Sequence, residues 1–188
     1  MLIPGGGFLA GSAENYGQDC QSFAREGFYA VSVENPLGSY ESGFRALRRR
    51  IPLAAMVVGG SAGGAYALHL TTIGAMRCAV ANAPAAPYVN RYLEWVMDSL
   101  SGRQAAIPDV SAAAVARTSA SSPLLVFHDA RDPIIPIASS TLLERLPNVE
   151  LRRVAALEPH AIPFSAYGPQ AARFFDACRR VSSVPPGS

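Results

Sequence analysis

The chain contains no lysine, because all 16 of its basic residues are arginine. A chain without lysine cannot form a Schiff base with a carbonyl substrate, build a Ser-Lys dyad or supply the lysine of a P-loop. Charge of either sign is also sparse, at 16% of 188 residues. The densest basic run, residues 48–50, is too short to indicate a nucleic-acid-binding face, and we interpret it as a solvated helix end. We therefore expect no nucleic-acid partner.

Cysteine is scarce as well. Cys20, Cys78 and Cys178 form an odd, widely spaced set without the spacing of metal ligands, which indicates neither a disulfide framework nor a zinc site. We interpret all three as buried thiols in a reducing compartment, and we predict no metal and no other cofactor. The sequence begins close to a Gly-rich loop, without the pattern of a signal peptide and without an apolar run of roughly 18 residues. These features predict a cytoplasmic protein that does not associate with a membrane.

The composition that remains is that of a globular protein, since 49% of the residues are hydrophobic. A chain of this length buries about 70% of the surface that its unfolded form exposes. Short β-branched and aromatic runs alternate with longer Ala-rich amphipathic segments, which is typical of a parallel sheet covered by helices on both faces. We predict a single α/β domain over residues 1–188, a three-layer sandwich with a mostly parallel central sheet, and a disordered tail over 182–188.

The patterns place the individual elements as follows. Strands are predicted over residues 2–4, 28–33, 56–58, 78–81, 124–128 and 149–154. Helices are predicted over residues 14–26, 43–50, 62–72, 139–145 and 170–180. Residues 83–120 are irregular, with prolines framing a predicted helix over 89–100, and we expect this insertion to form a small helical lid.

The segment over residues 59–63 reads Gly-Gly-Ser-Ala-Gly and lies between an apolar strand and an Ala-rich helix. A strand that turns sharply into a helix holds its apex residue in strained geometry, and glycines two positions away on either side remove the collisions. Ser61 would then raise its hydroxyl above the sheet, and the Ala62 amide would point toward developing negative charge. The alternative is a Gly-rich phosphate turn or a plain strand-helix corner.

A serine hydroxyl needs a base, and the base needs a group that orients it. His160 lies in a loop between the last strand and the last helix, from which it could reach over the sheet, so we predict it as the base. His69 is expected to be packed or on the surface, and His128 to support the turn after its strand. Of the two carboxylates in that turn, we predict Asp132 as the orienting acid and Asp129 as a turn cap. The order Ser, Asp, His is that of α/β-hydrolases.

With these residues in place, the sequence resembles the α/β-hydrolase superfamily, and within it the carboxylesterase branch with an H-G-G-G-F oxyanion motif. The matching stretch here is Pro4-Gly5-Gly6-Gly7-Phe8, in which proline replaces the histidine. The resemblance implies that the amides of Gly6 and Gly7, together with that of Ala62, bind the oxyanion. Two strands that usually precede the Gly-rich loop are absent, which implies a shortened member of the branch.

Aromatic residues are expected to border the substrate. Tyr88, Tyr92 and Trp95 share one side of the predicted lid helix. They either pack that helix on the body or line an apolar acyl or aryl pocket. Phe8 and Phe164 are expected to border the same cleft.

The chemistry predicted from these residues is hydrolysis of a small-molecule ester by a Ser-His-Asp triad through an acyl-enzyme. Thioester cleavage, acyl transfer and exopeptidase action would use the same groups, and a non-catalytic binding protein could retain the same fold. If the family's strand order holds, residues 28–33 lie at the sheet edge, where an apolar run invites pairing with another chain. We therefore hypothesise a homodimer.

Overall fold

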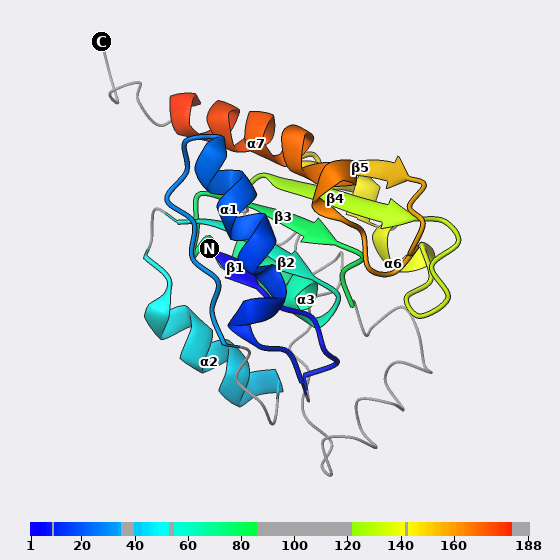
Figure 1. The fold of residues 1–188 in the computed structure, drawn as a ribbon, viewed down its shortest axis with the longest axis horizontal. Coiled ribbons are helices and arrows are strands. Elements are labelled where there is room, and N and C mark those ends of the chain that lie inside the picture. Colours follow the sequence, from blue (N-terminus) through cyan, green and yellow to red (C-terminus); the bar gives the residue numbers. More distant parts are fainter. Residues whose placement is uncertain (9, 35–39, 53–54, 86–121, 142, 182–188) are drawn as a thin grey trace.

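The computed structural model describes residues 1–8, 10–34, 40–52, 55–85, 122–141 and 143–181. Its centre is a five-stranded sheet in which every neighbouring pair of strands runs parallel (Figure 1). The strands lie side by side in chain order: β1 (Leu2–Ile3), β2 (Met56–Gly60), β3 (Cys78–Asn82), β4 (Leu124–Asp129) and β5 (Val149–Val154). The predicted α/β class and parallel central sheet are confirmed.

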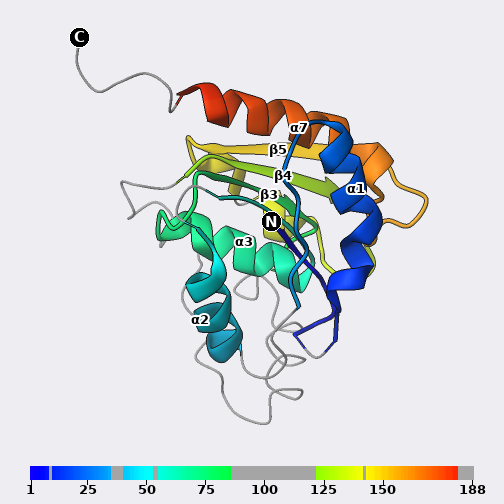
Figure 2. The same cartoon turned by 60° about the vertical axis from the view of Figure 1, so that its left-hand side comes forward.

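Helices cover both faces of this sheet (Figure 2). One face carries α1 (Gly17–Arg25), which follows a 3-10 turn over Ala13–Tyr16, and the C-terminal α7 (Phe164–Val181). The other face carries α2 (Tyr40–Arg50) and α3 (Ala62–Thr72). The segment after β4 holds the short α6 (Ala138–Thr141) and a 3-10 turn over Leu143–Arg145, where one helix over 139–145 was predicted.

The core divides into two clusters because side chains alternate between the two faces of a strand. Ile3, Val57 and Val126 lie in the cluster under α2 and α3, whereas Leu2, Val58 and Phe127 lie in the cluster under α1 and α7. Strands buried on both faces are continuous apolar runs, and this explains why the sequence signalled them clearly.

The predicted strand over 28–33 is largely wrong. Only Ser32 forms a bridge, to Leu2, supported by hydrogen bonds from Leu2 N to Val31 O and from Val33 N to Leu2 O. The segment does run along the outer side of β1. Because β1 has only two residues, its partner has too short a ladder to become a full strand.

Helix α7 begins six residues before its predicted start at Gln170. The predicted range of 170–180 leaves out Pro169, a residue that cannot donate a helical hydrogen bond. In the structure Pro169 lies inside the helix, and Phe164 and Tyr167 of the earlier turns pack on the core around Phe23 and Phe127. Tertiary packing therefore outweighs the missing hydrogen bond. The lid over residues 83–120 and the tail over 182–188 lie outside the described residues, apart from 83–85.

The interpretation of all three cysteines as thiols is also wrong. Cys78 of β3 and Cys178 of α7 are disulfide-bonded, with their Cα atoms 6.5 Å apart, and Cys20 is the free cysteine. A separation of 100 residues hides this pairing in the sequence, because it arises only when α7 packs on the sheet. Disulfides persist mainly in oxidising compartments, so the bond does not favour the predicted cytoplasmic location.

We expect denatured, unreduced protein to titrate as one thiol per chain, from Cys20, and reduced protein to titrate as three. Reduction should also lower the free energy of unfolding by about 4 kcal/mol, because the bond closes a long loop. Thiol titration in denaturant, followed by urea unfolding with and without reductant, measures both. The matched variant Cys178→Ser should titrate as two thiols without reductant. Three thiols in the unreduced wild type would contradict the bond.

Within the described part of the chain, no helix combines the length and the apolar character needed to cross a membrane.

Candidate active site

Ser61 lies where β2 turns into α3, at φ 52° and ψ −115°. A positive φ is strained for a residue with a side chain. The turn is held by hydrogen bonds from Ser61 N to Asn82 O and from Ala85 N to Ser61 O. Although Ser61 is the N-cap of α3, its hydroxyl makes no capping bond. The Oγ is therefore available to another group.

Glycines make this turn feasible. A Cβ on Gly59 would collide with the carbonyl of Gly63, and a Cβ on Gly63 would collide with the carbonyls of Ile3 and Pro4. The predicted reason for glycine at both positions therefore applies here, and close contact with β1 adds a second reason at Gly63.

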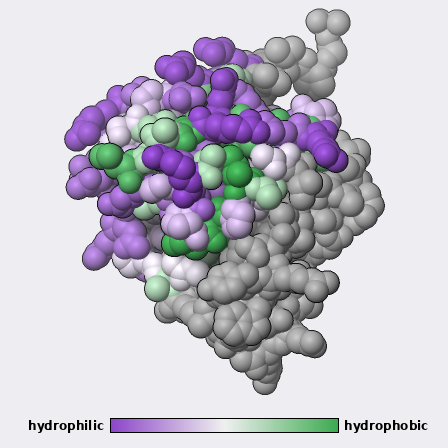
Figure 3. Space-filling view, turned by 90° about the vertical axis from the view of Figure 1, so that its right-hand side faces the viewer, coloured by the Kyte–Doolittle hydropathy of each residue, from purple (hydrophilic) through white to green (hydrophobic). Residues whose placement is uncertain are grey.

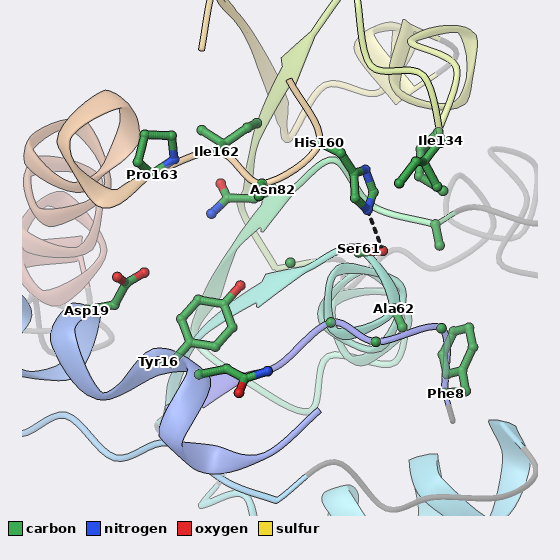
Figure 4. Close-up of a pocket in the computed structure, with 18 of the residues that line it drawn as sticks. Phe8, Tyr16, Asp19, Ser61, Ala62, Asn82, Ile134, His160, Ile162 and Pro163 are labelled. Carbon is green, nitrogen blue, oxygen red and sulfur yellow. Dashed lines mark hydrogen bonds between the residues drawn. The ribbon is translucent and has the colours of Figure 1, made fainter. Parts of the chain in front are cut away.

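The loop after β5 carries His160 to the serine (Figure 4). His160 Nε2 lies 3.1 Å from Ser61 Oγ, and His160 Nδ1 lies 2.8 Å from Asp132 Oδ2. With the proton on Nδ1, the ring donates to Asp132 and its Nε2 accepts the serine hydroxyl proton. Asp132 lies 28 positions and Ser61 lies 99 positions before His160 in the chain, yet the three side chains form one continuous hydrogen-bonded series.

The carboxylate of Asp132 is fixed by the turn that follows β4. Its Oδ1 accepts hydrogen bonds from the amides of Ile134 (2.8 Å) and Ile135 (2.9 Å), and its side chain is fully buried. His128 braces the same turn: its Nε2 donates to Ile135 O at 2.9 Å and its Nδ1 accepts from Ser140 Oγ at 2.7 Å. Burial lowers the pKa of His128, which is consistent with a neutral ring.

Asp129 serves a different purpose from Asp132. Its carboxylate accepts hydrogen bonds from the amide and guanidinium of Arg131 and from the amide of Ala156. These bonds hold the pKa of Asp129 well below its usual range. Asp129 therefore ties the turn after β4 to the loop after β5, and it makes no contact with His160.

His69 is half-buried near the C-terminal end of α3, whereas Ser61 lies at the N-terminal end of that helix. Its ring stacks on Phe44 at 3.7 Å between centroids, and Tyr40 Oη lies 3.2 Å from its Nδ1. Burial, with a smaller contribution from nearby Arg48, lowers the pKa of His69 to about 4. This histidine is packed, as one of the two predicted alternatives had it.

A cavity of about 590 Å³ opens above Ser61 at the carboxyl ends of the strands. Its lining includes Gly6 and Gly7 of the Gly-rich loop, which adopt φ values of 114° and 61°, and Ala62 at the start of α3. On the face viewed from this end, several hydrophobic side chains lie near the middle, with hydrophilic ones above them and to their left (Figure 3). The structure thus brings the predicted oxyanion donors to the same cavity as Ser61.

The predicted substrate-contacting residues have mixed positions. Phe8 and Phe164 both line the cavity, but Phe8 is 3% exposed and packs edge-on against Tyr40 and Tyr66, so most of its ring belongs to the core. Phe164 packs edge-on against Phe23. The predicted lid residues lie outside the described residues: they are Tyr88, Tyr92 and Trp95.

Sequence reasoning missed the polar side of the cavity. Tyr16 and Asp19 reach it from the helical segment after the Gly-rich loop, and Asn82 reaches it from the end of β3 (Figure 4). The available signal was the position of Asn82, a polar residue directly after an apolar strand, where the carboxyl ends of parallel strands form binding sites.

Comparison with known proteins shows similarity in structure only. No protein-family model and no curated protein matches the sequence. The chain is similar to esterase 2 of Thermogutta terrifontis, phosphoramylated by tabun, with a TM-score of 0.64, 19% identity and coverage of 99% of this chain and 84% of that one. It is also similar to the Paleococcus ferrophilus monoacylglycerol lipase, with a TM-score of 0.63, 15% identity and coverage of 93% and 91%.

A third similar structure, a lipase/esterase from Lactobacillus plantarum, has a TM-score of 0.65 at 14% identity and covers 94% of this chain and 84% of its own. Together with the parallel sheet and the strained serine turn, these similarities show that the chain has the α/β-hydrolase fold. The glycine-loop esterase branch within that superfamily stays a prediction.

Proposed function

We propose that this protein is a serine hydrolase that cleaves carboxylic esters. The observation that carries the proposal is the hydrogen-bonded series from Asp132 through His160 to Ser61, which ends at a strained turn in the floor of a cavity. A nucleophile, a base and a group that orients the base are what acyl transfer requires. The similar folds of esterases and lipases add support.

In the proposed mechanism, Ser61 Oγ attacks the ester carbonyl while His160 Nε2 takes its proton. Asp132 keeps the other ring proton on Nδ1 and stabilises the imidazolium that forms. The imidazolium then protonates the departing alkoxide, which leaves as the alcohol. Water repeats the sequence on the acyl-enzyme: His160 takes its proton, the hydroxide adds to the carbonyl, and Ser61 leaves with the proton returned.

Negative charge develops on the carbonyl oxygen in both steps. We assign its stabilisation to the backbone amides of Gly6, Gly7 and Ala62, which line the cavity beside Ser61. Preformed amide donors require no reorganisation when the charge appears, and loss of one such donor typically costs about 3 to 4 kcal/mol of the barrier.

Labelling with a fluorophosphonate probe tests the nucleophile. The phosphorus of the probe should bond to Ser61 Oγ with loss of fluoride, and Ser61→Ala should remove both the labelling and the hydrolysis of p-nitrophenyl acetate. Ser165→Ala, on an exposed part of α7, is the matched control and should label like the wild type.

Folded wild-type protein that does not label would favour a non-catalytic binding protein. Labelled protein that cleaves an acyl thioester or an aminoacyl anilide orders of magnitude faster than the ester would instead assign the same groups to thioesterase or exopeptidase activity. Parallel rates on the three substrates separate these outcomes.

A further inference from the structure

The cavity above Ser61 has a polar end that the proposed reaction does not use. Tyr16, Asp19 and Asn82 lie together there, on the side of the cavity away from Phe8 (Figure 4). This end is close to the serine, because Asn82 pairs with Gly60 across the β2–β3 ladder and its carbonyl accepts the Ser61 amide. A Cβ on Gly60 would collide with the Tyr16 hydroxyl, so the phenol also lies directly beside the nucleophile turn.

Hydrogen bonds fix the orientation of Asp19 and Asn82. Tyr167 donates its hydroxyl proton to Asp19 Oδ2, and its oxygen accepts a hydrogen bond from the side-chain amide of Asn82. Since the NH2 group of Asn82 is directed to Tyr167, its other amide atom, Oδ1, is the one left over. Asn82, Asp19 and Tyr167 come from β3, α1 and α7, respectively. The arrangement is therefore built by the packing of three separate elements.

The leftover atom is what indicates a ligand. Asn82 is 4% exposed, and its Oδ1 has no hydrogen-bond partner within the described residues. A buried carbonyl oxygen without a partner is costly, and such groups in native proteins usually serve a function. Because Asn82 lines the cavity, a molecule bound there could donate a hydrogen bond to it.

Asp19 at this end of the cavity can also accept a hydrogen bond. Burial raises the pKa of Asp19, and the hydrogen bond from Tyr167 partly opposes that effect. Within the described chain, no arginine forms an ion pair with Asp19. An amide oxygen and an uncompensated carboxylate both accept hydrogen bonds. Esters with a purely alkyl chain would leave the Asn82 oxygen without a donor and would give Asp19 no donor besides Tyr167.

We propose that this polar end, formed by Asn82, Asp19 and Tyr16, binds a hydrogen-bond-donating group of the substrate, a hydroxyl or an ammonium, several bonds from the scissile ester. The inference rests on the proposed ester hydrolysis for the identity of the ligand as a substrate. It makes the enzyme selective for polar esters over alkyl esters of the same length, because only the polar esters supply the hydrogen-bond donor that the Asn82 oxygen lacks.

The first experiment separates binding from turnover by using the Ser61→Ala variant, which cannot complete the reaction. Calorimetry would measure its affinity for methyl esters of alkanoic, ω-hydroxyalkanoic and ω-aminoalkanoic acids of three to six carbons, and for the acetates of the matching alcohols, diols and amino alcohols. We expect at least one hydroxyl or ammonium series to bind about 10-fold or more tightly than its alkyl counterpart. The hydroxyl and ammonium arms show which donor is recognised.

Two variants locate that preference. In the Ser61→Ala background, Asn82→Ala should reduce it to about 2-fold or less by removing the free acceptor, and the near-isosteric Asp19→Asn should reduce the ammonium preference most. Glu26→Gln, an exposed carboxylate just after α1, is the matched control and should leave it unchanged. With Ser61 restored, the control Glu26→Gln should hydrolyse p-nitrophenyl acetate at the wild-type rate.

The outcomes are distinct. Equal affinity for polar and alkyl esters at every length, or a preference that survives both variants, would overturn the polar subsite whether or not the wild type is an esterase. A preference that depends on Asn82 or Asp19, in a protein that neither labels nor hydrolyses any ester, would uphold the subsite and overturn the proposed function.

Discussion

Replacing Asp132 with asparagine is expected to lower kcat for ester hydrolysis by about 10⁴-fold with little change in the fold. An asparagine amide can present NH2 to His160 Nδ1, which favours the tautomer whose proton is on Nε2. That proton faces Ser61 Oγ, so the ring can no longer accept the serine proton. Steady-state kinetics with p-nitrophenyl acetate, together with far-UV circular dichroism, measures the effect.

The neighbouring carboxylate provides the control. Asp129→Asn keeps the Asp132–His160–Ser61 contacts but weakens the bonds to Arg131 and Ala156. We expect kcat within a few-fold of the wild type and a lower urea midpoint, the reverse of the Asp132→Asn result. Equal loss of activity in the two variants would show that the turn after β4 matters as a whole and that Asp132 has no separate role.

Replacing Gly63 with alanine is expected to destabilise the protein by about 3 kcal/mol, a large effect for one added methyl group. The Cβ would meet two backbone carbonyls, those of Ile3 and Pro4. Backbone cannot rotate aside as a side chain can, so α3 and β1 must separate. Since the Gly-rich loop follows β1 directly, activity should fall along with stability. Urea unfolding followed by circular dichroism measures the change.

Gly17→Ala is the matched substitution in a helix. Gly17 begins α1 at φ −58°, and a Cβ there meets no atom within 4 Å. Alanine has the higher helix propensity, so stability should stay the same or rise by up to about 1 kcal/mol. A Gly63→Ala protein as stable as Gly17→Ala would mean that β1 does not contact α3 as described.

The groups brought to Ser61 were predictable because each carries a local signal. The serine lies in a glycine-flanked strand-helix turn, and Asp132 and His160 follow strands in loops at the same end of a parallel sheet. The polar end of the cavity carried no such signal. Tyr16 and Asp19 read as the start of an amphipathic helix, and Asp19 is linked to Asn82 only through Tyr167 of α7.

The errors in the predicted fold share one cause: each of the features concerned depends on long-range contacts. Cys78 and Cys178 meet because α7 packs on β3, and Pro169 stays helical because its neighbours are buried. The run over 28–33 has strand composition, but strand formation needs a partner of equal length and β1 supplies only two residues. Composition describes the segment alone and cannot report its partner.

The segment beside β1 bears on how two molecules could share a surface. The carbonyl of Val31 and the amide of Val33 form hydrogen bonds with Leu2. The amide and carbonyl of Ser32 therefore point away from β1, on a segment that also carries the exposed ring of Tyr29. In the hypothesised homodimer, a twofold axis through this margin would make the two copies run in opposite senses. The two Ser61 residues would then lie at opposite ends of the merged sheet, and neither copy would cover the cavity of the other.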